Sequence, residues 1–454
     1  MVAIVGGGIA GLAAAYELAT RGIPFALFEA SDRLGGLVRT EHADGFTIEA
    51  GADSMLAQKR AGLDLCAELG LTPRLIAPKD PRTAFVLHRG RLHALPSPSM
   101  FGIPATWRQI ASYALLPVVA RARLAIEPFV PVRTDRADEA VAAFFRRRFG
   151  AATVGLLAQP LLGGIHAGDV EALSLPALFP RLAEAERSGR TVLRWVRQTA
   201  RAGEAGGAFR SLSSGMGELV ESIRRRLPAG AVHCGSAVTS LARHGSGWEL
   251  TTAGGRGQFA AVILACPAHA AAGILAPIDP RAAEICAQVR YVSTVSIALG
   301  WPRDAISHPL HGSGFVVARA SNAVRITACT WVSSKWDGRA PAGRALLRAY
   351  AGGAHDPAAV DMSDEELIDL AAGELSAILS ISGPPALARV YRWRDAGAQH
   401  EVGHLARMQE LDERLARHRG LFVTGSGFRS IGIPDCVADA RAVAVHAGGC
   451  THET

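Results

Sequence analysis

A glycine-rich stretch near the N-terminus has the residue types and spacing that bind phosphate. Residues 6–11 read GGGIAG, follow the apolar run at 2–5, and precede a predicted helix near Leu12. Gly6 allows a tight turn, Gly8 lets the backbone approach a pyrophosphate, and Gly11 lets the helix pack closely on the strand. The N–H groups at the start of that helix then face the phosphate charge. This spacing predicts a dinucleotide site rather than a merely structural strand–helix unit.

An acidic residue stands where a second strand is expected to end. The apolar run at 25–28 is followed by Glu29, about twenty residues after the glycines. A carboxylate at this point accepts hydrogen bonds from ribose hydroxyls, and its charge disfavours a ribose that carries a 2′-phosphate. Glycines and acid together indicate a dinucleotide without that phosphate, but they do not choose between a nicotinamide and a flavin.

The bulk composition describes a folded chain with more than one core. A length of 454 residues predicts two or three domains, and 49% hydrophobic against 20% charged residues excludes a disordered chain. The net charge of +7 comes almost entirely from arginine, because the only lysines are Lys59, Lys79 and Lys335. This charge favours acidic small molecules or an anionic membrane surface. No basic block with interleaved aromatic residues supports nucleic-acid binding.

The cysteine pattern and the hydropathy of the chain indicate in which cellular compartment the protein is expected. The seven cysteines are scattered without a CxxC pair, so we expect reduced thiols in a cytoplasmic protein, and neither a disulfide framework nor a metal site. A strand that begins at residue 2 leaves no room for a signal peptide. No stretch approaches the roughly 18 to 20 apolar residues of a membrane span, whereas peripheral contact with a membrane remains open.

The pattern of elements changes along the chain. Two strands are expected at 83–88 and 91–95, and helical periodicity dominates 97–206, as in 140–149. Strand-like runs return near 232, 237–241, 248–252 and 259–264, and again at 294–301, 314–318, 325–331 and 345–350. A buried strand at 421–425 and a helix from about Asp435 close the chain. The predicted fold class is α/β, with a Rossmann-like domain assembled from separate segments.

Longer motifs resemble the flavin-containing amine oxidase superfamily, and within it the oxygen-dependent protoporphyrinogen/coproporphyrinogen oxidases. The N-terminal motifs are GGGIAGLAAAYEL, FEASDRLGGLVRT and GFTIEAGADSML. The narrower ones are GRLHALPSP, FFRRRFG, QPLLGGIHAGD, LSLPALFPRL, FRSLSSGMGELV, VGHLARM and LFVTGSGFRSIGIPDCV. They occur in the family's order and cover nearly the whole chain. The resemblance implies an FAD-binding domain at 1–75, 207–270 and 415–454, a substrate-binding domain at 76–96 and 271–414, and a helical membrane-docking and substrate-access domain at 97–206.

The same resemblance implies non-covalent FAD and residues that line it from end to end. These are Gly6, Gly7, Gly8, Ile9, Ala10, Gly11, Glu29, Arg33, Gly35, Gly36, Leu37, Gly51, Ala52, Asp53, Ser54, Val238, Trp393, Ser426, Ile431, Gly432 and Ile433. Trp393 packs near the flavin in this interpretation, with a core aromatic as the alternative. The start of the last helix would stabilise negative charge on the reduced flavin.

For the substrate, the resemblance implies contacts from Gly164, Phe315, Ala318 and Tyr350. The alternative for Gly164 is a glycine that packs helices, and for the other three it is an ordinary strand core. In the animal and plant branch an arginine just before the first pocket strand contacts a substrate propionate. Ala84 stands at that position here, and Arg82 is on the same strand face and is a candidate replacement. His166 and His400 replace aromatic residues and are expected to be neutral and hydrogen-bonded.

The implied reaction is the oxidation of a porphyrinogen to a porphyrin in haem biosynthesis, with O2 as acceptor and H2O2 released. No side chain is assigned a catalytic role, and protoporphyrinogen IX is favoured over coproporphyrinogen III. An amine oxidase or carotenoid desaturase on the same scaffold is an alternative, and so is a non-catalytic flavoprotein or haem-pathway scaffold. The expected oligomeric state is a monomer or a homodimer, and a neighbouring haem-pathway enzyme is a candidate partner.

Overall fold

A parallel five-stranded sheet forms the centre of one half of the molecule. The computed structural model describes residues 1–135, 137–188, 191–201, 207–318 and 324–451. The strand order is β12-β2-β1-β16-β22, with β1 at Val2–Val5, β2 at Phe25–Phe28, β12 at Val232–His233, β16 at Ala261–Leu264 and β22 at Leu421–Val423. All four pairings are parallel. Short apolar runs buried on both faces are typical of such a sheet.

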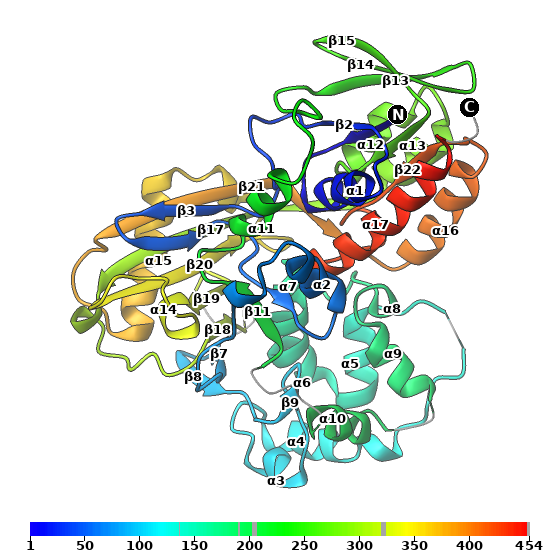
Figure 1. The fold of residues 1–454 in the computed structure, drawn as a ribbon. Helices are drawn as coiled ribbons and strands as arrows, with labels where there is room; N and C mark the ends of the chain where they lie inside the picture. The colour runs from blue at the N-terminus through cyan, green and yellow to red at the C-terminus, as the bar shows by residue number, and fades with distance from the viewer. Residues whose placement is uncertain (136, 189–190, 202–206, 319–323, 452–454) are drawn as a thin grey trace.

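Helices cover both faces of this sheet, because alternate strand residues point to opposite sides. Ile4, Leu27 and Ile263 pack with α1 (Ile9–Thr20), α2 (Arg60–Glu68), α11 (Gly217–Arg224) and α17 (Ile433–Gly449). Val5, Val262 and Leu264 pack with α12 (Ala268–Leu275), α13 (Pro280–Ala287) and α16 (His404–Leu415). A three-stranded ribbon of β13 (Val238–His244), β14 (Gly247–Thr252) and β15 (Gly255–Phe259) lies beside them (Figure 1).

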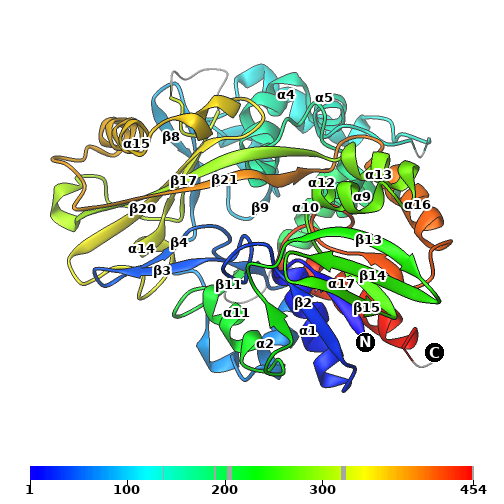
Figure 2. The same cartoon turned by 90° about the horizontal axis from the view of Figure 1, so that it is seen from above.

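A second sheet has seven strands in the order β21-β17-β20-β19-β18-β7-β8. Their bounds are Leu387–Gln399, Arg290–Pro302, Arg344–Gly352, Ala328–Trp331, Gly314–Val317, Ala84–His88 and Arg91–Ala94. One face packs on α15 (Asp364–Leu379), and the other faces β3 (Thr40–Ala43) and β4 (Phe46–Glu49), as Figure 2 shows. The second sheet therefore packs on β3 and β4, which follow β2 of the parallel sheet in the sequence.

The helical segment packs around its own core at the lower side of Figure 1. Its helices are α3 (Trp107–Ser112), α4 (Val118–Ala125), α5 (Val141–Phe149), α6 (Ala151–Thr153), α7 (Gly164–His166), α8 (Leu175–Leu178), α9 (Pro180–Arg187) and α10 (Val192–Arg201). A π-helix, η3, spans Val154–Gly163 with Pro160 inside it. The fully buried Glu127 carboxylate pairs with Arg148 and accepts the N–H groups of Val192 and Leu193 at the start of α10.

The α/β fold class is confirmed, and most predicted elements lie within a few residues of their expected bounds. Three features were not expected: the 13-residue strand β21, helix α15, and the π-helix. The last helix begins slightly earlier than expected, because α17 starts after Gly432 and Asp435 lies in its first turn. Residues 271–287, assigned above to the substrate-binding domain, contribute to the core of the parallel sheet; the domain boundaries stay a prediction. None of the described helices is long and apolar enough to cross a membrane.

Candidate active site

The glycine turn joins β1 to α1 and shows which of its glycines are needed for packing. A Cβ on Gly6 would lie 2.8 Å from the Ala265 carbonyl oxygen, and a Cβ on Gly11 only 1.8 Å from that of Gly6. A Cβ on Gly8 would meet nothing within 4 Å. The φ of Gly8 is −68°, a value that any residue can adopt. The backbone at Gly8 therefore borders open space at the start of α1, where N–H groups have no side-chain cap. This is a cradle for an anionic group.

Glu29 lies directly beside this turn. Its Oε2 accepts the Gly7 N–H at 2.6 Å, and its Oε1 accepts the Ser31 N–H at 2.8 Å and the Ser31 hydroxyl at 2.7 Å. A carboxylate has about four lone-pair sites, so one remains for a ribose hydroxyl and the rotatable Ser31 hydroxyl can yield another. The Ser236 N–H donates to the Glu29 carbonyl, and β13 begins two residues later at Val238. The predicted adenosine end is therefore assembled from segments far apart in the sequence.

The loop at residues 33–37 lies beside the glycine turn. Gly35 forms an isolated bridge with Gly8. Arg33 donates to the Gly36 carbonyl at 2.8 Å, and this bond orders the loop. The next contact is the Ala52 N–H, which donates to the Leu37 carbonyl at 3.2 Å.

Residues 50–52 then meet the second sheet. The Trp393 indole donates to the Ala50 carbonyl at 2.9 Å, and a Cβ on Gly51 would lie 3.2 Å from the Trp393 ring. The predicted cofactor residues thus form a continuous path from Glu29 to Trp393.

Asp53, at the end of this path, is held by two cations. Lys335 Nζ donates to its Oδ2 at 3.1 Å, and an Arg348 terminal nitrogen lies 3.3 Å from the same oxygen. Arg348 also donates to the Glu49 and Gly51 carbonyls at 2.6 and 3.0 Å. Although burial opposes ionisation, Lys335 and Arg348 hold the pKa of Asp53 below its usual range.

The loop before α17 is fixed by two stacked histidines. The His400 and His404 rings lie 3.8 Å apart, nearly parallel, and both side chains are buried. Their Nε2 atoms donate to the Ser426 carbonyl at 2.9 Å and the Phe428 carbonyl at 2.6 Å. Burial lowers the pKa of His400, and it lowers that of His404 to about 3, so both rings are neutral near pH 7.

The loop ends at the N-terminus of α17. Gly432 there has a φ of +84° and an open Cβ position, between half-buried Ile431 and buried Ile433. Gly425, at the start of the same loop, approaches Ala10 of α1, since its Cβ would lie 3.7 Å from the Ala10 Cβ. The loop therefore faces the glycine turn.

The predicted substrate residues are not all brought together. Tyr350 lies on the same face of β20 as Arg348, with its ring 5.0 Å from the Arg348 guanidinium. Phe315 packs on the opposite face, in the core with α15, and Ala318 packs in the core of the helical segment. Arg82 is engaged by Asp80 at 3.2 Å and by the Pro78 carbonyl. The contacts predicted for Phe315, Ala318 and Arg82 therefore gain no support from their placement and stay predictions.

Gly164 lies at an open position. It follows the π-helix, is exposed, and a Cβ there would meet nothing within 4 Å. The neighbouring His166 has a pKa lowered to about 4 by burial, with smaller effects from His400 and Lys59. Ala167 accepts the Ala354 N–H at 2.8 Å. Gly164 therefore lies where the helical segment meets the second sheet.

Sequence reasoning missed Arg348 and Glu49, and it noted Lys335 only as one of the three lysines. Arg348 interrupts the apolar strand 345–351, and an ionised residue inside such a run is a sign of a buried partner. The partner itself, Asp53, lies almost three hundred residues away and could not be identified from spacing.

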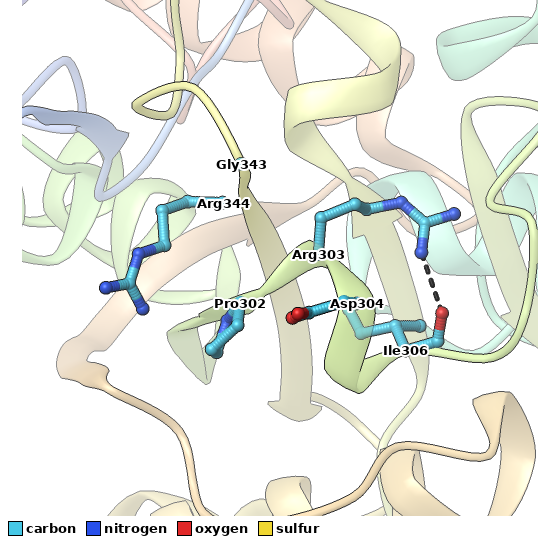
Figure 3. A pocket seen from close by; sticks show the side chains of 6 residues that line it. All are labelled: Pro302, Arg303, Asp304, Ile306, Gly343 and Arg344. Carbon is cyan, nitrogen blue, oxygen red and sulfur yellow. Dashed lines mark hydrogen bonds between the residues drawn. The ribbon is translucent and has the colours of Figure 1, made fainter.

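An open surface hollow of about 630 Å³ lies at the other end of the second sheet, lined by Pro302, Arg303, Asp304, Ile306, Gly343 and Arg344 (Figure 3). The Arg303 guanidinium already donates to the Ile306, His308 and Pro309 carbonyls. Since none of these residues belongs to the path from Glu29 to Trp393, we place the candidate active site along that path instead.

The path fits an extended dinucleotide that ends in a flavin. The Gly8 cradle suits the pyrophosphate, Glu29 the adenosine ribose, and the segment 50–54 with Trp393 and the start of α17 suit a flat ring. The N-termini of α1 and α17 have no side-chain caps, so their free N–H groups would suit the anionic parts of such a molecule.

The chain is similar to known proteins along most of its length. A family profile described as flavin containing amine oxidoreductase matches residues 9–447. The coproporphyrinogen III oxidase of Bacillus subtilis (strain 168) is 36% identical, covering 97% of this chain and 96% of that protein. Protoporphyrinogen oxidase 1, chloroplastic, of Spinacia oleracea is 28% identical, covering 96% of this chain and 82% of that protein. A crystal structure from Exiguobacterium sp. 255-15, named as a candidate protoporphyrinogen oxidase, superposes with a TM-score of 0.89 at 31% identity, covering 98% of both chains.

Proposed function

The chain belongs to the flavin-containing amine oxidase family, and we propose that it is an FAD-dependent oxidase that converts coproporphyrinogen III to coproporphyrin III in haem biosynthesis, with O2 as acceptor. The observation that carries the proposal is the similarity to the Bacillus subtilis coproporphyrinogen III oxidase along 97% of this chain. The continuous path from Glu29 to Trp393 supports non-covalent FAD as the cofactor.

The relatives favour coproporphyrinogen III over protoporphyrinogen IX, the substrate that the sequence motifs favour. The Bacillus subtilis coproporphyrinogen III oxidase is 36% identical to this chain, against 28% for the spinach protoporphyrinogen oxidase. The two substrates differ in charge, because coproporphyrinogen III carries four propionates and protoporphyrinogen IX carries two. The formal net charge of +7 is compatible with the more acidic substrate.

The chain's own residues would bind FAD and orient its ring toward the substrate. FAD would supply the redox chemistry when bound: in each of three rounds the porphyrinogen would lose two electrons and two protons, and O2 would take them up as H2O2. Glu29 and the Gly8 turn would anchor the adenosine and pyrophosphate, and Trp393 with residues 50–54 would set the plane of the ring. Gly164, open and exposed where the helical segment meets the second sheet, would admit the macrocycle. No protein base is needed, because a pyrrole N–H can lose its proton as conjugation develops.

The exposed apolar tip of the helical segment supports a further proposal, docking on an anionic membrane surface. Val118, Val119 and Phe129 are 70%, 80% and 85% exposed, and Trp107 is 50% exposed. Exposed Arg108 lies next to Trp107 on α3, so apolar and cationic groups share this end of the molecule. Such a combination suits the interface of a membrane that carries anionic lipids.

A rate comparison tests the enzymatic proposal. The FAD-loaded protein is given coproporphyrinogen III or protoporphyrinogen IX in air, and porphyrin fluorescence and H2O2 are followed against an FAD-free control and an anaerobic control. We expect a faster initial rate with coproporphyrinogen III and H2O2 formation in step with the porphyrin. A faster rate with protoporphyrinogen IX would reverse the substrate assignment, and no acceleration with either would reject the oxidase. Release of H2O2 with polyamines instead would favour the amine-oxidase alternative.

A further inference from the structure

A buried cluster of charges encloses the segment that follows β4. We call it the Asp53 cluster; its members are Glu49, Asp53, Lys335, Arg339 and Arg348. They come from β4, the loop after it, the end of α14 (Val332–Lys335), the residues that follow α14, and the middle of β20. Every member side chain is less than one-fifth exposed. The cluster therefore joins the loop of the parallel-sheet half to the face of the second sheet.

Its contacts fix the backbone of the segment as well as the carboxylates. Arg348 binds the Glu49 and Gly51 carbonyls, and the Ser211 hydroxyl binds the Asp53 carbonyl at 2.7 Å. Arg339 in turn donates to the Ser211 hydroxyl at 2.8 Å and lies 3.4 Å from Glu49 Oε1. Each carbonyl from Glu49 to Gly51 is held by Arg348 or Trp393, so the segment has little freedom.

The cluster is not electrically balanced. Three cationic side chains face two carboxyl groups. Burial raises the pKa of Glu49, which moves that carboxyl toward its neutral form and increases the imbalance. Among the described residues, Arg348 Nε has no hydrogen-bond partner, and Arg339 Nε and one of its terminal nitrogens have none. Excess positive charge inside a protein is costly unless something anionic compensates for it.

We propose that Lys335 and Arg348 are positioning residues that fix the segment 49–54 beside the flavin and apply to it a net positive charge that favours the reduced cofactor. The inference rests on the proposed function for the presence of FAD. Oxidised flavin gains two electrons and one proton from the substrate and so acquires one negative charge. A nearby cation stabilises that form over the oxidised one, while Asp53 opposes part of the effect.

The sign of the effect separates this role from a merely structural one. Replacing Lys335 with Met removes positive charge and should make the midpoint potential of bound FAD more negative. Replacing Asp53 with Asn removes negative charge and should make the potential more positive. Loss of structure alone would not move the potential in opposite directions for the two variants. Lys335→Arg keeps the charge and should restore the wild-type potential.

The chain offers a matched control. Lys79 pairs with Asp337 at 3.3 Å on the surface, with both side chains at least 40% exposed, and its backbone N–H binds the Lys335 carbonyl. Lys79→Met removes a lysine from the same neighbourhood without touching the buried cluster. Its FAD affinity and potential should match those of the wild type.

The experiment measures the potential of protein-bound FAD during reductive titration with a reference dye, and the affinity for FAD by fluorescence. For Lys335→Met we expect at least a tenfold loss in the preference for reduced over oxidised FAD, which equals about 30 mV for two electrons. Unchanged potentials, or shifts of the same sign in Lys335→Met and Asp53→Asn, would overturn the inference. Should Lys335→Met fail to fold, the positive shift in Asp53→Asn still decides.

The outcome is separable from that of the proposed function. If FAD binds and the potentials shift as described but no porphyrinogen is oxidised, the cluster's role stands and the substrate assignment fails. If FAD does not bind at all, the segment 49–54 lines no flavin and the inference falls with it.

Discussion

Substitution of Gly8 by alanine separates the binding role of the glycine turn from its role in packing. Because a Cβ at this position meets nothing within 4 Å and φ is −68°, alanine fits the folded backbone. The remaining cost is that alanine is a poorer residue than glycine before the first turn of a helix, which amounts to less than about 1 kcal/mol. The open space is where the pyrophosphate would approach, so the added methyl group displaces it. We expect FAD to bind at least ~100-fold more weakly, a loss of about 2.7 kcal/mol.

Two other glycines provide the comparison. Gly373, exposed inside α15, also has an open Cβ position, and Gly373→Ala should stabilise the protein by about 0.5 to 1 kcal/mol without changing FAD affinity. Gly11→Ala places its Cβ 1.8 Å from the Gly6 carbonyl oxygen and should abolish folding.

The assay titrates the apo-protein with FAD and follows flavin fluorescence, while urea unfolding of the apo-protein reports stability. If Gly8→Ala binds FAD within twofold of the wild type, the pyrophosphate does not pass this turn, and the assignment of the cradle is wrong.

Three further outcomes are expected. Glu127→Gln removes the charged partner of the buried Arg148 and leaves it Glu186 at 3.5 Å and two backbone carbonyls, so it should lower the free energy of unfolding by about 3 kcal/mol in urea titrations. Adding Arg148→Met should recover part of the loss. Burial lowers the pKa of His404 to about 3, below the value of about 6.5 in the unfolded chain, so the unfolded state binds more protons as the pH falls below 6.5. Stability should therefore decrease from pH 8 to pH 5, by about 2 kcal/mol from this group, and His404→Gln should remove that part of the slope. Sedimentation with phosphatidylglycerol vesicles should be lost when Val119 and Phe129 are both replaced by Asp; a wild-type protein that stays in the supernatant contradicts membrane docking.

The glycine turn could be predicted from the sequence because its parts are close together in the chain. The strand before it, the three glycines and Glu29 lie within the first 29 residues, and each has one physical task. Strand β21 was missed because Arg389, Arg392 and Arg394 make its sequence look like a solvated loop. In the structure these arginines bind Glu41, Asp364 and Asp361, which are distant in sequence.

The substrate side of the site was harder to predict because strand residues alternate between faces. Phe315 and Tyr350 were expected to share a pocket, yet Phe315 packs toward α15 and Tyr350 lies on the other face. An error of one residue in register reverses the face of a side chain, and sequence alone does not fix the register of a seven-stranded sheet. The Asp53 cluster depends on pairs that only the fold brings together.

The order of strands in the parallel sheet has a consequence for how the protein is made. Strand β1 pairs with β16 at residues 261–264, and β16 pairs with β22 at residues 421–423. Helix α1 packs against α17, which follows β22. During synthesis the phosphate-binding turn therefore emerges among the first residues but has no complete platform until the chain is almost finished. Contacts across such long loops close slowly, and we expect cofactor loading to follow release from the ribosome rather than to guide early folding.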